Sequence, residues 1–413
     1  MQIDKRLVKK IQVKSCQSFE FLQKIRRELH AHPELSGQES WTADYIEKSL
    51  KDLEVEIKKN VGGHGLVVDL VTDPNKPTVA LRVDMDALPF QEANNVSYQS
   101  GIPGVMHACG HDVHSAIGIG TAFILYSLSD SLPGNIRFIF QPEEEQITGA
   151  KRMIREGVLD DPTPKAIFGL HVAPLPVGQV AWTDGLFLAG FDHYLATLVP
   201  GENNLISNAQ LDAAAQHCCK AIQKLNQWHL PETWGSMQAF WELLRDPPKN
   251  LRNFIIYDAS LNEEDPDAWH GEFGIGVKAA TPNLRRSALG RIRASVTRIC
   301  RLAKLNYHIE PMGSMIDMIN DTHLSQSTLP ALNAAIGEDN LVHLKAAFPF
   351  NCEDFAYYAK EIPGAMVWLG AGNPEEGKYA LLHTPDFDVD ESCLITGTTA
   401  MAVLLIEALH QNS

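Results

Sequence analysis

The stretch TVALRVDMDALP, residues 78–89, begins with a short apolar run rich in β-branched residues and ends with two aspartates and a proline. An apolar run of this length, bounded by polar residues and proline, predicts a buried strand over Thr78–Val83. Asp84 and Asp86 follow that strand directly. A metal-binding histidine usually donates its second N–H to a carboxylate that holds the ring in place. These two aspartates fit that role. The plainer interpretation is that they cap a turn or a helix.

Similar apolar runs recur on both sides of this stretch, and helical patterns lie between them. The first 60 residues are predicted to be helical, with one helix around Phe19–Leu29 and a second over Ser40–Leu53. Alternation of strands and helices predicts an α/β fold with a mixed, largely parallel sheet covered by helices. Such sheets bind ligands at the carboxyl ends of their strands. The expected strands are Leu66–Val71, Ile136–Gln141, Ala166–Leu170 and Ala365–Leu369, and the expected helices are His114–Leu128, Thr148–Glu156 and Ser392–His410.

The pattern changes between residues 186 and 312. Alternating stretches at Tyr194–Val199 and Phe273–Lys278 flank helical ones at Leu211–Gln227 and Leu284–Leu305. This texture predicts a smaller α+β domain at 186–312, inserted into a catalytic domain made of 1–185 and 313–413. A chain of 413 residues is long enough for two such domains.

Composition narrows the range of partners. A net charge of −16 without a Lys/Arg cluster argues against nucleic acid and against anionic membrane surfaces. No stretch reaches the roughly 18 unbroken apolar residues of a membrane span, and the charged start of the chain does not resemble a signal peptide. The seven cysteines are scattered, which disfavours a disulfide framework. We therefore expect a cytoplasmic protein with reduced thiols.

Two short motifs contain chemically active side chains. The first, HACGHDVH at residues 107–114, contains Cys109 and His111, and thiolate and imidazole are good ligands for zinc and related metals. The second, QPEEE at residues 141–145, follows a predicted strand with three adjacent carboxylates. A bound cation would relieve their mutual repulsion, so that one glutamate binds metal while its neighbour stays free as a base. A polar helix start and a solvated acidic turn are the ordinary alternatives.

Two further histidines, His171 and His383, lie at a predicted strand end and in a loop. Either one alone is more often an ordinary buried or surface histidine. Together, however, the cysteine, the glutamate and the three histidines suit two adjacent divalent ions that share a ligand and activate water. The cysteine favours zinc, and the mixed ligand set also permits manganese or cobalt. A closed structural zinc site fits less well, because the candidates spread from Cys109 to His383 beside a spare glutamate.

Seven ordered blocks resemble the aminoacylase/carboxypeptidase family of dinuclear metallo-amidohydrolases. The branch with hippurate hydrolase, IAA-amino acid hydrolase and N-acetyldiaminopimelate deacetylase looks most similar. The resemblance covers roughly residues 23–185 and 315–413. The blocks are LHAHPELSGQE, LRVDMDALPFQE, MHACGHDVHSA, IRFIFQPEEE, GLHVAPLPVGQV, NCEDFAYYAKEIPG and LLHTPDFDVDE.

The resemblance implies a role for each matching residue. Glu144 would be the general base that moves a proton from the activated water to the leaving amine. Asp86 would contact a metal ligand rather than the metal and hold that ligand in position. The substrate would be an N-acyl amino acid or a peptide-like small molecule, cleaved at its amide bond. A dipeptidase or carboxypeptidase of the same family, and a binding protein without turnover, remain alternatives. The implied metal ligands are Cys109, His111, Glu145, His171 and His383.

The inserted domain departs from the family pattern. The family usually has a Gly-Gly-His turn after the first strand of this domain, whereas residues 199–205 here read VPGENNL. The family's Asn-Val-Ile-Pro-Asp and Gly-Thr-x-Arg segments correspond to the stretches at 253–258 and 274–278, which differ. The resemblance allows a homodimer through this domain, but these departures leave the dimer and the substrate-holding residues open. His193, His217 and His229 are expected to be ordinary domain or surface histidines.

Overall fold

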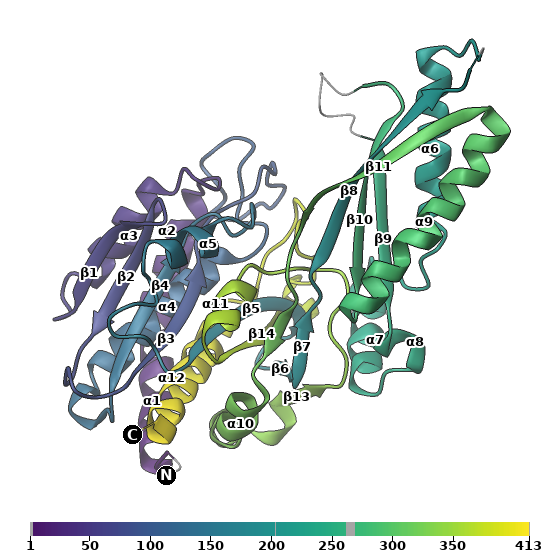
Figure 1. Cartoon of the computed structure of the whole chain (residues 1–413). Coiled ribbons are helices and arrows are strands. Elements are labelled where there is room, and N and C mark those ends of the chain that lie inside the picture. The colour runs from purple at the N-terminus through teal and green to yellow at the C-terminus, as the bar shows by residue number, and fades with distance from the viewer. Residues whose placement is uncertain (1–2, 203, 262–268, 413) are drawn as a thin grey trace.

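The computed structural model describes residues 3–202, 204–261 and 269–412. Within these ranges the chain forms one large mixed sheet and a smaller antiparallel sheet that projects from it (Figure 1). The α/β architecture with a smaller additional sheet, expected from the sequence, is confirmed.

The large sheet has the strand order β1-β2-β4-β3-β5-β14-β6-β13. Neighbouring strands are parallel from β4 through β3 and β5 to β14, and the β2–β4 and β14–β6 pairs are antiparallel. The late strand β14 therefore lies between two strands formed much earlier in the chain. The strands are β1 (Glu56–Val61), β2 (Gly65–Leu70), β3 (Thr78–Asp84), β4 (Asn135–Gln141), β5 (Ile167–Pro176), β6 (Val180–Thr183), β13 (Leu341–Leu344) and β14 (Gly364–Gly372).

Helices cover both faces of the large sheet. On one face, α4 (His111–Tyr126) and α12 (Cys393–Asn412) are buried nearly all round, because a second layer of helices packs outside them. By length and composition α12 could cross a membrane, but 83% of its apolar window is buried inside the protein. The outer helices are α1 (Lys5–Gln17), α2 (Phe19–Ala31), α3 (Ser40–Leu50) and α10 (Thr322–Ile336), and the opposite face carries α5 (Gly149–Arg155), α7 (Trp234–Arg245) and α11 (Ala356–Glu361).

The small sheet has the order β11-β8-β10-β9, and every pair in it is antiparallel. Side chains of β10 alternate between buried and half-buried, and the buried ones meet α6 and α9 on one face. The short strands β7 (Gly185–Leu188) and β12 (Met318–Asn320) pair where the chain leaves and re-enters the larger unit. The remaining elements are β8 (Phe191–Pro200), α6 (Asn208–Gln223), α8 (Lys249–Arg252), β9 (Ile255–Leu261), β10 (Glu272–Ala279), α9 (Pro282–Ala303) and β11 (Leu305–Ser314).

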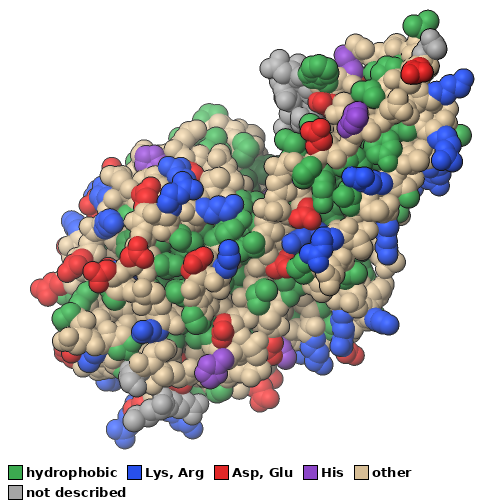
Figure 2. All heavy atoms as spheres, in the orientation of Figure 1, with side chains coloured by type: hydrophobic (Ala, Val, Ile, Leu, Met, Phe, Trp, Pro, Cys, Tyr) green, Lys and Arg blue, Asp and Glu red, His purple; other side chains and the backbone are tan. Residues whose placement is uncertain are grey.

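Two expectations from the sequence need correction. Residues 56–61 form strand β1 rather than helix, since they pair with β2 across a tight turn. The expected lack of a Lys/Arg cluster is wrong for α9, where helical spacing gathers exposed arginines, and blue side chains follow this helix in Figure 2. These arginines are Arg286, Arg291, Arg293, Arg298 and Arg301.

Candidate metal centre

The carboxyl ends of the parallel strands and the start of α4 bring the five predicted metal ligands together. The Sγ atom of Cys109 lies 3.4 Å from Nε2 of His171 and 3.2 Å from Nε2 of His383. Two sets of candidate ligand atoms share Cys109, and within each set all atoms lie within 4.8 Å of one another. One set adds His111 and His171, and the other adds Glu145 and His383. Two neighbouring ions that share one ligand require this arrangement.

The hydrogen bonds of two histidines leave the correct nitrogen free for a metal. Nδ1 of His111 lies 2.9 Å from the backbone oxygen of Asp86 and 3.1 Å from its Oδ1, so Nδ1 carries the proton. Nδ1 of His171 lies 2.7 Å from the backbone oxygen of Val172 and is protonated for the same reason. In the neutral form of both rings, Nε2 then has the lone pair and faces the cluster, as a metal ligand requires.

His114 lies close to this cluster, but hydrogen bonds occupy both of its ring nitrogens. The backbone N–H of Val172 donates to its Nε2 at 2.9 Å, and its Nδ1 lies 2.6 Å from Oδ1 of Asp84. Both ring nitrogens are thus engaged with the protein. His114 and Asp84 instead fix β5 against α4 behind the ligands.

The unpartnered atoms of the cluster fit bound cations. Nε2 of His111 and Oε1 of Glu145 are buried, and neither has a hydrogen-bond partner among the described residues. Burial raises the pKa of Glu145 to about 7 and raises the pKa of the Cys109 thiol well above its usual value. Divalent ions would supply the missing partners and favour the charged forms of both side chains. The donor set, one thiolate, one carboxylate and three imidazoles, suits such ions.

Glu144 lies next to the ligands and has a different environment from them. The residue is 6% exposed, and its carboxylate oxygens group with those of Glu353 and Asp354 within 4.8 Å. Burial and the charge of Glu353 raise the pKa of Glu144 well above its usual value. Beneath this acidic group, the buried guanidinium of Arg82 pairs with Glu353 at 3.1 Å and with Asp354 at 2.9 Å. Glu144 is therefore a carboxylate with a high affinity for a proton at the edge of the metal site.

Glu143 does not add its charge beside Glu144, although the sequence suggests that it could. Its backbone has a positive φ of 56°, and its side chain turns towards Arg152 and Thr148. His383 also has a positive φ, 60°. Such a conformation is uncommon for residues other than glycine and occurs where the surrounding structure imposes it, often at functional sites.

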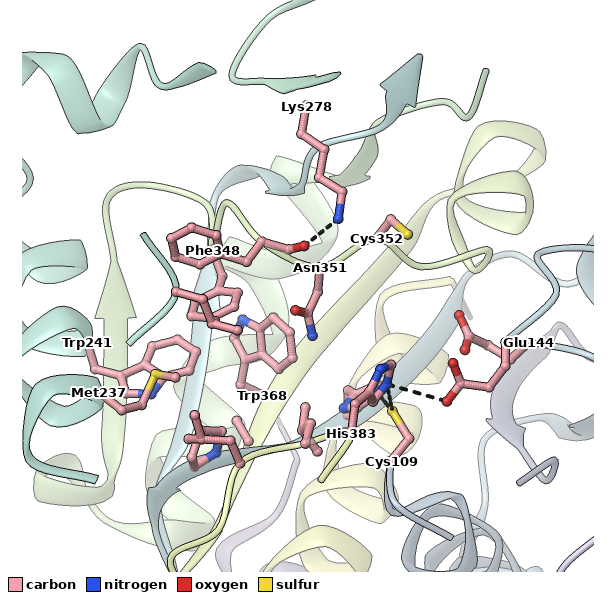
Figure 3. A pocket seen from close by; sticks show the side chains of 18 of the residues that line it. Cys109, Glu144, Met237, Trp241, Lys278, Phe348, Asn351, Cys352, Trp368 and His383 are labelled. Carbon is pink, nitrogen blue, oxygen red and sulfur yellow. Dashed lines mark hydrogen bonds and ion pairs between the residues drawn. The ribbon is translucent and has the colours of Figure 1, made fainter. Parts of the chain in front are cut away.

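A cavity of about 350 Å³ opens beside the cluster, and Cys109, Glu144 and His383 lie in its wall (Figure 3). Opposite them the wall is aromatic. The side chains of Lys278 and Asn351 also line the cavity. No sequence pattern predicts a role for Asn351, Trp241 or Trp368. Asn351 begins the block NCEDFAYYAKEIPG, whereas only the tertiary structure brings the two tryptophans to the site.

A second cavity of about 610 Å³ adjoins the first and shares Lys278, Phe350 and Cys352 with it. His193 and His229 line this second cavity. His217 instead lies in a groove between α6 and α9. Of the unusual stretch at 199–205, Asn203 lies outside the described residues.

Comparisons with known proteins agree with this geometry. The chain is 30% identical to N-acetylcysteine deacetylase of Bacillus subtilis, over 94% of this chain and 96% of that protein. It is 30% identical to IAA-amino acid hydrolase ILR1-like 2 of Arabidopsis thaliana, over 97% of this chain and 88% of that protein. The crystal structure of Bacillus subtilis YXEP, a dinuclear metal-binding peptidase of the M20 family, superposes with a TM-score of 0.71 and 29% identity, over 95% of this chain and 98% of that one.

The sequence pattern of peptidase family M20/M25/M40 matches residues 80–407, which include every predicted metal ligand and Glu144. Homologous proteins in the comparison are hydrolases of amide or peptide bonds. This chain therefore belongs to peptidase family M20/M25/M40.

Proposed function

We propose that this protein is a metal-dependent amidohydrolase that removes the acyl group from an N-acyl amino acid or a related small conjugate. One observation carries the proposal: the five predicted ligand side chains gather around Cys109, and four of them, Cys109, Glu145, His171 and His383, line the same cavity as Glu144. The names of the relatives, a deacetylase and an amino acid conjugate hydrolase, support the same class of reaction.

We propose that Cys109, His111, Glu145, His171 and His383 hold two divalent ions, with zinc favoured by the thiolate and manganese or cobalt compatible with the remaining ligands. When bound, such ions lower the pKa of water and polarise a carbonyl group. Asp86 fixes both the ring of His111 and the backbone of Glu145, so the two ligands keep their relative position.

Glu144 acts as the general base and then as the general acid. Its carboxylate accepts a proton from the attacking water, whose oxygen forms the new bond to the acyl carbon. The same carboxyl group then donates that proton to the nitrogen as the C–N bond breaks, so the products are a carboxylic acid and an amine. The acidic surroundings that Glu353 and Asp354 create help Glu144 to hold the proton between these two steps.

Lys278 provides the positive charge for the amino acid part of the substrate. Among the described residues, it is the Lys or Arg side chain in the wall of the first cavity. Its ammonium group donates to the backbone oxygen of Phe350 and keeps further N–H groups for a carboxylate. Lys278 lies in β10, so the small sheet contributes to the site.

Metal analysis and substrate assays together test the proposal. Protein purified without added metal or chelator should contain about two equivalents of a transition metal. It should also hydrolyse members of a panel of N-acyl amino acids. Dipeptides assayed beside them distinguish a deacylase from a dipeptidase. Full metal loading without turnover on any member would instead favour a binding protein.

A further inference from the structure

Two cysteines that play no part in the metal centre meet between the helices that cover the small sheet. Cys218 lies on α6 and Cys300 on α9, and these two helices pack side by side (Figure 1). The thiol of Cys218 donates a hydrogen bond to the sulfur of Cys300. Both residues are at most 2% exposed, and both thiols are free. The sulfur atoms are therefore close enough for a disulfide to join them after a small shift of the side chains.

The hydrogen bond makes the two thiols chemically different. Both cysteines belong to the apolar core between α6, α9 and the small sheet. A thiol in such a core is normally inert, because burial disfavours the reactive thiolate. Here the S–H of Cys218 lowers the pKa of Cys300, and its own pKa is raised because it supplies the shared proton. Cys300 is thus the thiol of the pair that ionises more readily.

Cys300 also borders a cavity that the proposed hydrolysis does not use. This cavity of about 510 Å³ lies where the last turns of α9 meet β8 and β11, and Cys300 is in its wall. Among the described residues that line it, Cys218 is absent. A small molecule that enters this cavity therefore reaches Cys300 before it reaches Cys218.

The wall of this cavity favours an anion. Arg301 and His308 line it, together with Thr297 and Tyr307, whose hydroxyls lie 2.9 Å apart. The described residues of the wall include no aspartate or glutamate. A guanidinium group in such a wall suits a ligand that carries a carboxylate.

We propose that Cys300 and Cys218 form a thiol–disulfide exchange site for small disulfides that carry carboxylates, such as glutathione disulfide. The thiolate of Cys300 attacks one sulfur of the small disulfide, whose S–S bond breaks, and the first thiolate leaves. Cys218 then loses its proton and attacks the sulfur of Cys300, which releases the second thiolate and leaves a Cys218–Cys300 disulfide. The two leaving thiolates take up the two protons that the cysteines lose. One small disulfide is thus reduced to two thiols as the pair is oxidised, and this reaction does not depend on hydrolysis at the metal centre.

Peptide mapping by mass spectrometry tests the site on the folded, full-length protein. After incubation with glutathione disulfide, we expect a Cys218–Cys300 cross-link in the wild-type protein, and dithiothreitol should reverse it. Cys218→Ser should instead retain one glutathione on Cys300, because the second attacking thiol is missing. Cys300→Ser should leave Cys218 unmodified. Absence of the cross-link in the wild-type protein, or glutathione on Cys218 in the Cys300→Ser variant, would overturn the inference.

The neighbouring cysteine, Cys219, provides two controls. It is similarly buried on the same helix, but burial raises its pKa to about 11 and the exchange does not use it. Cys219→Ser should therefore form the cross-link at the wild-type rate. In the wild-type protein, Cys219 should stay unreactive towards iodoacetamide while the cross-link forms. Labelling of Cys219 at the rate of cross-linking would place the reaction in unfolded chains and overturn the site.

A charge variant tests the preference for carboxylates. Bis(2-hydroxyethyl) disulfide is uncharged, so the ratio of the cross-linking rates with glutathione disulfide and with this reagent reports the effect of charge. Arg301→Gln should lower that ratio by about two- to fivefold, as expected for an exposed ion pair. Arg298→Gln, an exposed position on α9 outside the cavity wall, is the matched control and should leave the ratio unchanged. An unchanged ratio in Arg301→Gln would overturn the assignment of carboxylate-bearing disulfides as the substrate class.

Discussion

Oδ1 of Asp86 lies 3.1 Å from Nδ1 of His111, and both side chains are fully buried. The other oxygen of Asp86 accepts the backbone N–H of Glu145 at 3.0 Å and the hydroxyl of Ser36 at 2.7 Å. One carboxylate thus orients two proposed metal ligands.

Asp86→Asn places an amide N–H against one of these donors. We expect metal affinity to fall by about 10–100-fold, measured by competition with a chelating dye. Unchanged affinity would show that Asp86 does not position the ligands.

Glu144→Gln should abolish most of the activity and leave the metal site intact. The amide cannot accept and return a proton, so kcat should fall by about 100- to 10,000-fold. Metal content by elemental analysis should stay at the wild-type value. Glu143→Gln is the matched control, because the Glu143 side chain faces Arg152, and its kcat should stay near the wild-type value. A Glu144→Gln enzyme with near-normal kcat would remove Glu144 from the mechanism.

Cys109 takes part in both candidate ligand sets, whereas His383 takes part in one. We therefore expect Cys109→Ala to lose both metal equivalents and His383→Ala to lose one of them. Elemental analysis after gel filtration measures the metal content of each variant. Equal losses in the two variants would argue against a shared thiolate ligand.

Glu39→Gln should change the dependence of stability on pH. Glu39 is fully buried, one of its oxygens accepts the backbone N–H of Glu143, and the other has no partner among the described residues. Burial raises the pKa of Glu39 to about 7. The folded protein therefore holds a proton that the unfolded chain releases at a lower pH, and wild-type stability falls as the pH rises from about 4.5 to 7.

The neutral glutamine has no proton to lose, so the variant should become more stable than wild type as the pH rises. The difference in the free energy of unfolding should be absent near pH 4 and reach at most roughly 3 kcal/mol at pH 8. Thermal unfolding midpoints of both proteins at pH 5 and pH 8 measure the difference. A difference that is the same at both pH values would contradict a raised pKa for Glu39.

Lys278→Met should weaken binding of substrates that carry a free carboxylate. Hydrogen bonds to charged groups are worth about 1.5–3 kcal/mol, which corresponds to an increase in KM of about 10- to 100-fold. The same acyl amino acid with its carboxylate converted to an amide is the control substrate, and its KM should change little. An equal effect on both substrates would show that Lys278 acts on the shape of the cavity instead.

Local patterns of the sequence predict most of the strands and helices near the site. The strand predicted at Thr78–Val83 is observed as Thr78–Asp84, and the one at Ile136–Gln141 as Asn135–Gln141. These strands are buried on both faces, so their apolar runs are unbroken. The place of His171 is less well predicted, because β5 continues past it to Pro176 and this predicted ligand lies within the strand rather than at its end.

The pocket could not be predicted in the same way. Trp241 and Trp368 meet because α7 packs on the large sheet beside β5, and no local periodicity encodes that contact. Lys278 appears in the sequence only as a departure from a family motif. A homodimer through the small sheet and a cytoplasmic location stay predictions, because the fold of one chain contains neither its partner nor its compartment.

The position of β14 has a consequence for how the protein forms during synthesis. This strand, residues 364–372, fills the middle of the large sheet between β5 and β6. Until the ribosome has made it, both neighbouring strands expose unpaired edges and apolar faces, and sequential folding of the larger unit cannot finish. The small sheet, whose strands lie within 191–314, can close earlier. A nascent chain stalled before residue 364 should therefore depend on chaperones to keep these exposed edges from aggregating.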